Sequence, residues 1–354
     1  MGWGGMKILI VKVSALGDIV HALPVLAWIR SAVPAARIDW LVEESFASLL
    51  EGHPLVHRVV RLRTKAWRNG NIIAALQGAF GQIRALRRER YDCVLDLQGN
   101  SKSGLFTLFT GAPLRFGFDR SGVREWPNLL ATNRHIGLTD ADHHVSDRSL
   151  AIARAAFAEG CDHPLAGPLP VNPDDRQRVE NLIREKGLSD QPLVVLHYGT
   201  TWKTKLWPVD LWQQLAERLC REDHLRPVLT WGNPEELAVA ERIHQATEGT
   251  AVIWPRGSLG ELSALLKQAD LVVAGDTGPL HIAAAHGTST VSMFRVTDAL
   301  RNGPRGTGHI RLQSPLNCSP CLEKTCDRDA ECGHSIGLSP VLEAVRALLK
   351  GKRG

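Results

Sequence analysis

The chain of 354 residues contains no apolar run close to the roughly 18 residues that a membrane-crossing helix needs. Its early apolar run, Ile8–Val11, is short, lies between Lys7 and Lys12 and lacks a small-residue cleavage site. It therefore indicates a first β-strand and not a signal peptide. No strand-to-helix turn has the pattern G-x-G-x-x-G, which argues against a dehydrogenase. We expect a cytoplasmic protein.

A large excess of charge of either sign is also missing. The net charge is +5 and charged residues make up 22% of the chain. This mildly basic balance lacks the charge density of a nucleic-acid binder but suits an anionic ligand or a membrane surface. The chain is longer than one ordinary hydrophobic core requires, so we expect two domains.

Strand and helix patterns alternate along the whole chain, which predicts an α/β protein with parallel sheets. We expect two Rossmann-like domains facing a central cleft. Prolines and glycines crowd the segment 164–173 and predict a linker between a domain at 1–165 and a second at 174–337. A last amphipathic helix within 338–354 is expected to pack back on the first domain. The main predicted strands are 7–13, 37–42, 58–62, 92–97, 193–197, 227–231, 251–254, 271–274 and 290–294, and one helix is predicted over 19–33.

The most informative segment is a buried strand, 271–274, followed by Gly275-Asp276-Thr277-Gly278-Pro279 and an Ala-rich helix. A strand that enters a helix through small residues leaves backbone N–H groups unpaired at the helix N-terminus, where an anion is favoured. Asp276, Thr277 and His281 lie at that point. The segment predicts a phosphate-type site at the carboxyl edge of a sheet.

A similar turn follows the first strand. Ser14-Ala15-Leu16-Gly17-Asp18 places an acid at the start of a helix. Asp18 either caps that helix or serves as a general base, and the spacing does not separate the two.

Two further loops follow strands of the second half. In Gly199-Thr200-Thr201-Trp202-Lys203-Thr204-Lys205, hydroxyl residues followed by lysines suit a diphosphate, although such lysines are also common in solvated loops. In Gly232-Asn233-Pro234-Glu235-Glu236, an acid either binds a ribose diol or complements a helix dipole.

Taken together, these segments resemble glycosyltransferase family 9, the bacterial lipopolysaccharide heptosyltransferases, and within it most of all the heptosyltransferase I branch. The resemblance covers nearly the whole chain. It is carried by KVSALGDIVHALP at 12–24, DWLVEE at 39–44, DLQG at 96–99, KLWP at 205–208, WGNP at 231–234 and GDTG at 275–278.

The resemblance implies a GT-B fold, an ADP-L-glycero-D-manno-heptose donor, a Kdo–lipid A inner-core acceptor, inversion in one step and no metal in catalysis. Asp18 falls on the family's catalytic base, and Lys205 on a group that stabilises the leaving diphosphate. The donor-binding positions implied are Thr200, Thr201, Lys205, Glu236, Gly257, Asp276, Thr277, Gly278 and His281.

Basic residues of the first half are candidates for binding the anionic acceptor. They are Arg61, Arg63, Lys65 and Arg68, next to Trp67, and further along the chain Lys102 and Arg120. A run of this kind is also typical of a plain solvated face. Arginines of the predicted helix 72–89 could rest on anionic lipid, so we expect peripheral contact with the inner membrane, no nucleic acid and a monomer.

Four cysteines near the C-terminus have the spacing C-x2-C-x4-C-x5-C: Cys318, Cys321, Cys326 and Cys332. They form either a structural zinc site or a set of reduced thiols. This cluster is more like the heptosyltransferase II branch. The identity of the acceptor is therefore left open, and the alternatives are heptosyltransferase II or another family 9 transferase with a different acceptor. A nucleotide-sugar epimerase of GT-B shape and a non-enzymatic ligand-binding protein are the alternatives from other classes.

Overall fold

The computed structural model describes residues 5–63, 72–161 and 168–350. The chain forms two compact units, Met1–Pro170 and Val171–Gly354. Their boundary lies within the proline-rich segment that the sequence indicates as a linker.

The first unit is built on a six-stranded sheet with the order β3-β2-β1-β4-β5-β6. Every neighbouring pair is parallel. The central strands are buried on both faces, which explains why Ile8–Val11 is an unbroken apolar run. The strands are β1 (Lys7–Val11), β2 (Arg37–Glu43), β3 (Arg58–Leu62), β4 (Cys93–Asp96), β5 (Leu114–Phe118) and β6 (Arg134–Ile136).

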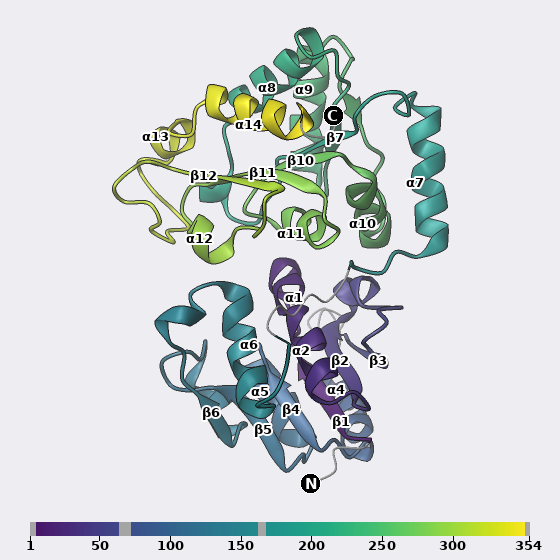
Figure 1. The fold of residues 1–354 in the computed structure, drawn as a ribbon, viewed down its shortest axis with the longest axis vertical. Helices are drawn as coiled ribbons and strands as arrows, with labels where there is room; N and C mark the ends of the chain where they lie inside the picture. Colours follow the sequence, from purple (N-terminus) through teal and green to yellow (C-terminus); the bar gives the residue numbers. More distant parts are fainter. Residues whose placement is uncertain (1–4, 64–71, 162–167, 351–354) are drawn as a thin grey trace. The chain divides into compact units, whose positions relative to one another are not determined.

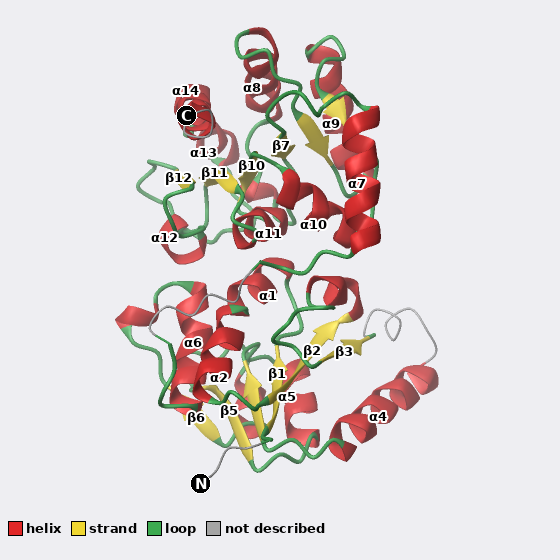
Figure 2. Cartoon of the chain, turned by 45° about the vertical axis from the view of Figure 1, so that its right-hand side comes forward, coloured by secondary structure: helices red, strands yellow, loops and turns green. Residues whose placement is uncertain are grey.

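Helices cover both faces of this sheet (Figure 2). Contacts group α1, α2 and α6 together, and α4 with α5. The helices are α1 (Leu16–Ala22), α2 (Pro24–Ala32), α4 (Ile72–Arg88), α5 (Ser101–Phe109) and α6 (Val145–Ala156). The single helix predicted over 19–33 is two helices, because Pro24 has no N–H to continue α1 and instead starts α2.

The second unit repeats this plan with the order β12-β11-β10-β7-β8-β9, again parallel throughout (Figure 1). Contacts group α7, α10 and α11 together, and α8, α9 and α14. The strands are β7 (Val194–His197), β8 (Val228–Thr230), β9 (Val252–Ile253), β10 (Leu271–Gly275), β11 (Ser289–Phe294) and β12 (His309–Gln313). The helices are α7 (Pro173–Glu185), α8 (Val209–Arg221), α9 (Pro234–Ala246), α10 (Leu259–Gln268), α11 (Gly278–Ala285), α12 (Ala299–Asn302), α13 (Asp329–His334) and α14 (Leu338–Lys350).

The C-terminal helix α14 belongs to the second unit. Its apolar face packs on β10, β11, β12 and α8 (Figure 1). Val341 and Val345 are fully buried in the core of that unit. The helix is therefore part of the core of the second unit, and its expected packing on the first domain stays a prediction. Among the described residues, no helix has both the length and the apolar character to cross a bilayer.

Both sheets therefore have the strand order 3-2-1-4-5-6 in their own numbering, and the α/β fold expected from the sequence is confirmed. In such a sheet the chain leaves the two central strands in opposite directions. The loops after these strands diverge and open a crevice at the carboxyl edge. This switch point lies between β1 and β4 in the first unit and between β7 and β10 in the second. The predicted turns after β1, β7 and β10 lie at these switch points, whereas the fourth predicted loop, 232–236, follows β8.

Candidate functional site

A buried ion pair marks the switch point of the second unit. The Lys205 ammonium lies 2.8 Å from Asp276 Oδ2, and the side chains of these residues are only 16% and 6% exposed. His281 Nε2 lies 3.3 Å from the other carboxylate oxygen. Asn302, at the end of α12, donates to Asp276 Oδ2 at 3.3 Å. The structure thus brings together three residues that the sequence predicted and one that it did not.

The charge of Asp276 is fixed by these partners. Burial alone would raise the pKa of Asp276, but the hydrogen bond from His281 and the Lys205 ammonium outweigh it and hold that pKa well below its usual range. Asp276 is therefore ionised at neutral pH, and it holds the Lys205 ammonium in a fixed position.

The local sequence explains how these groups meet. A Cβ at Gly275 would lie 3.3 Å from the carbonyl oxygen of Lys205, so a glycine lets the end of β10 approach the loop after β7 closely. Thr277 is the N-cap of α11, with extended backbone, and Gly278 and Pro279 form the first helical positions. The free N–H groups at the start of α11 therefore lie next to Asp276, which holds Lys205. This is a suitable place for phosphate oxygens.

The loop after β7 carries the remaining predicted phosphate residues. Thr200 and Thr201 come three and four residues after the end of β7, and Lys205 ends a short 3₁₀ turn that starts at Lys203. The Lys205 ammonium also lies 4.8 Å from the ring centroid of Trp202. A cation at this distance is attracted to the ring face, so Trp202 helps to hold Lys205 in the crevice.

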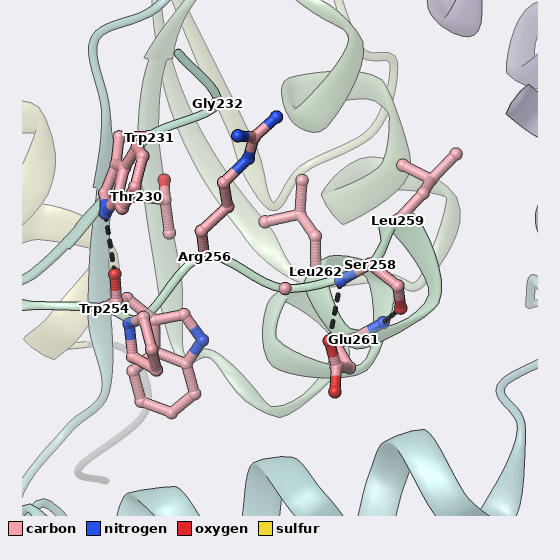
Figure 3. Close-up of a pocket in the computed structure, with 11 residues that line it drawn as sticks. Thr230, Trp231, Gly232, Trp254, Arg256, Ser258, Leu259, Glu261 and Leu262 are labelled. Atoms are coloured by element: carbon pink, nitrogen blue, oxygen red, sulfur yellow. Dashed lines mark hydrogen bonds between the residues drawn. The ribbon is translucent and has the colours of Figure 1, made fainter. Parts of the chain in front are cut away.

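An open pocket of about 200 Å³ lies beside this crevice, after β8 and β9. Figure 3 shows Trp231, Trp254 and Arg256 on one side of it and the first turn of α10 on the other. The Trp231 indole N–H donates to the Trp254 carbonyl at 2.9 Å, which fixes the ring. Gly257 also lines the pocket, and its role in donor binding stays a prediction. Aromatic walls and a nearby guanidinium suit a flat heterocyclic ring.

Glu236 lies in the first turn of α9, next to the pocket residue Gly232. Its carboxylate accepts the backbone N–H of Gly232 at 2.7 Å, and Asn233 caps the helix by accepting the N–H of Glu236 at 2.9 Å. A Cβ at Gly199 would collide with this carboxylate, so the glycine permits its approach to the loop after β7. Glu236 therefore has a structural role at the start of α9. A ribose contact for Glu236 stays a prediction.

In the first unit, Asp18 lies in the first turn of α1. It accepts the N–H of Ala15 at a long 3.4 Å and lies 3.5 Å from a guanidinium nitrogen of Arg124, while its own side chain is 26% exposed. Gln98 Oε1 accepts the N–H groups of Val13 and Ser14 at 3.0 and 3.1 Å and thereby fixes the loop that leads to Asp18. The carboxylate is held in place yet remains open to a substrate.

Three of the candidate acceptor residues already have acidic partners. Arg61 pairs with Glu51 at 2.6 Å and Arg63 with Glu44 at 2.8 Å. Lys102 lies 3.2 Å from Glu43 Oε2. Arg120 lies on an exposed turn after β5. Lys65 and Arg68 lie outside the described residues.

The four C-terminal cysteines differ in their surroundings. Cys332 is buried in α13, Cys321 is half-buried, and Cys318 and Cys326 are exposed. Within 5–63, 72–161 and 168–350, no three His, Cys, Asp or Glu side chains gather closely enough to hold a metal ion. As placed, the four thiols therefore do not fit a tetrahedral zinc site. Protein groups hold the segment instead: the buried Arg295 guanidinium donates to the Asp329 carboxylate at 2.7 Å.

Sequence reasoning missed several residues that the fold brings to the site. Arg124 reaches Asp18, Asn302 reaches Asp276, and Trp202 holds Lys205. Arg124 and Asn302 belong to no predicted motif, and each lies on a loop or at an element's end. Trp202 lies inside the predicted loop 199–205, where it was given no role. Only the tertiary structure identifies them. Trp231 was present in the WGNP segment, where an indole beside a small-residue turn was the available signal.

Sequence comparisons identify related proteins. The sequence model of glycosyltransferase family 9 (heptosyltransferase) matches residues 80–330. Lipopolysaccharide heptosyltransferase 1 of Pseudomonas aeruginosa is 35% identical over 91% of this chain and 87% of its own length. The protein of the same name from Escherichia coli is 30% identical over 90% of this chain and 99% of its own length.

Solved structures show the same fold. The E. coli heptosyltransferase WaaC with ADP superposes with a TM-score of 0.73 and 26% identity, covering 98% of this chain and 99% of that one. A family 9 glycosyltransferase from Veillonella parvula, at 18% identity, reaches a TM-score of 0.83, covering 99% and 98% of the two chains. The chain therefore belongs to glycosyltransferase family 9, the heptosyltransferases, and is an enzyme of the glycosyltransferase class.

Proposed function

We propose that this enzyme transfers the heptose of ADP-L-glycero-D-manno-heptose to the Kdo–lipid A inner core of lipopolysaccharide, with inversion at the anomeric carbon. The observation that carries the donor half of the proposal is the Lys205–Asp276–His281 cluster at the N-terminus of α11. Relatives named lipopolysaccharide heptosyltransferase 1, at 30–35% identity, support the acceptor of heptosyltransferase I over that of heptosyltransferase II. Family membership argues against a mere ligand-binding protein.

The second unit suits an ADP moiety. The indole-lined pocket of Trp231 and Trp254 would take the adenine ring, with Gly257 at its edge. Glu236 lies next to the pocket residue Gly232 and would accept hydrogen bonds from a ribose diol. The diphosphate would lie at the free N–H groups of Thr277 and Gly278 and beside Lys205. Thr200 and Thr201, on the loop after β7, would donate their hydroxyl groups to it.

The proposed reaction is one displacement. Asp18 takes the proton of an acceptor hydroxyl, whose oxygen attacks the anomeric carbon of the heptose. The bond from that carbon to the diphosphate breaks, and ADP leaves with the electron pair. Lys205 and the N-terminus of α11 stabilise the negative charge that grows on the departing phosphate. Every group in this scheme belongs to the protein, and no metal is needed for a step.

A face of the first unit would bring the enzyme to its lipid acceptor. Exposed apolar side chains lie on α5 and on the 3₁₀ turn 126–130, which packs against α5. Trp126 and Leu130 are 70% and 72% exposed. The adjoining α4 carries exposed arginines, Arg84, Arg87 and Arg88. Apolar groups beside cations are typical of peripheral contact with an anionic membrane surface.

The test is to incubate the purified protein with ADP-heptose and Kdo₂–lipid A and to weigh the lipid product. One added heptose is expected. Asp18→Asn should lower turnover by about two to four orders of magnitude, the usual contribution of general-base catalysis, and should leave the KM for ADP-heptose nearly unchanged. Asp140→Asn, an exposed carboxylate of the same unit, is the matched control and should retain full turnover.

Two results would count against the proposal. If the wild-type protein yields no heavier lipid, Kdo₂–lipid A is not its acceptor. A folded Asp18→Asn variant with near wild-type turnover would leave Asp18 as a helix-capping residue only.

A further inference from the structure

The segment 318–332, which we call the cysteine-rich loop, is fastened to the loop that carries Lys205. Thr204 donates its hydroxyl to the Glu323 carbonyl at 2.7 Å. The buried Arg295 guanidinium donates to the Leu206 carbonyl on one side and to Asp329, at α13, on the other. Because these bonds join buried or half-buried groups, the cysteine-rich loop has a defined position next to the phosphate site.

This position brings a second ammonium to the Trp202 ring. Lys324 Nζ lies 4.9 Å from the ring centroid, and Lys205 Nζ lies 4.8 Å from it. Since both distances are measured to the same ring centroid, the two nitrogens can be no farther apart than the sum of the distances, about 9.7 Å. That is comparable to the Debye length of ~8–10 Å at physiological salt, so both cations act on an anion bound near the ring.

The charge balance of the site calls for such a cation. Lys205 is already neutralised by Asp276, which stays ionised. A bound diphosphate carries several negative charges, and this ion pair alone supplies no net positive charge to offset them. Among the residues that the structure describes, no carboxylate pairs with Lys324, so its ammonium remains available to a ligand.

We propose that Lys324 is a further diphosphate-binding residue and that the cysteine-rich loop serves to position it. The inference rests on the proposed donor site and adds a residue to it. Trp202 holds both ammonium groups through its ring. Lys205 provides the fixed contact beside Asp276, and Lys324 provides the uncompensated charge. The cysteines lie in the loop that carries this lysine.

The test is a calorimetric titration of ADP and of AMP into the full-length protein and into Lys324→Gln. The affinity for ADP should fall about five- to tenfold, as for the loss of one charge-assisted contact to phosphate. The affinity for AMP, which lacks the second phosphate, should change by less than about twofold. Lys324→Arg keeps the charge and the ring contact and should bind ADP almost as the wild type does.

The matched control is Lys267→Gln, which removes one exposed lysine from the last turn of α10 in the same unit. It should leave both affinities unchanged. Equal losses for ADP and AMP in Lys324→Gln, or no loss for either while Lys205→Met loses ADP, would overturn the inference and leave the proposed donor site intact. Wild-type protein that binds no ADP would refute the donor site itself.

Discussion

The buried Lys205–Asp276 pair makes a prediction that joins stability to binding. Lys205→Met removes the ammonium and leaves the Asp276 carboxylate, 6% exposed, with His281 and Asn302 as its remaining partners. Removing one member of a buried ion pair costs about 3–5 kcal/mol, and the two surviving hydrogen bonds favour the lower end, about 3 kcal/mol. For a unit of this size, each kcal/mol shifts the Tm by roughly 2–4 °C. The transition of the second unit should therefore move down by about 6–12 °C.

The measurement is differential scanning calorimetry on the full-length protein, because two units need not unfold in one step. Asp276→Asn in the Lys205→Met background removes the uncompensated charge, so this double variant should recover more than half of the lost Tm. It should still fail to bind ADP, since both the ammonium and the group that orients it are gone. Stability and binding are thereby separated in one pair of proteins.

The reasoning fails if Lys205→Met lowers the Tm by less than about 2 °C. It fails equally if the double variant is no more stable than the single one. Either result would mean that water reaches the Asp276 carboxylate and that the pair is not buried in the sense used above.

Two further predictions concern pH and the membrane. Burial lowers the pKa of His197 to about 4, whereas an unfolded histidine titrates near ~6.5. Between these two pH values the unfolded chain therefore binds a proton that the folded chain does not. The free energy of unfolding consequently falls as the pH falls. His197→Gln should reduce this fall between pH 6.5 and 4.5 by about 2 kcal/mol in urea titrations; an unchanged pH dependence would show that His197 is already protonated in the folded protein. Leu130→Asp should lower cosedimentation with vesicles rich in anionic lipid, and equal binding of the variant and the wild type would place the membrane contact elsewhere.

The sequence alone was enough for the parts of this protein that depend on neighbouring residues. Period and composition predicted parallel α/β sheets, because buried central strands require continuous apolar runs such as Ile8–Val11. The turn Gly275–Gly278 predicted an anion site, because a strand that enters a helix through small residues has one local geometry. The strands β5, β6 and β12 escaped prediction, since charged residues or a glycine interrupt their short apolar patterns.

Tertiary structure decided what depends on distant residues. Lys205 and Asp276 lie 71 positions apart, and only the adjacency of β7 and β10 brings them together. Arg124 at Asp18, Asn302 at Asp276 and Lys324 at Trp202 leave no periodic or motif signal, because their contacts arise from where loops cross and not from local backbone preference. The spacing of the four cysteines suggested a metal, yet the fold holds that loop through Arg295 and Thr204. Local chemistry thus determined which elements form, and long-range packing determined which side chains share the site.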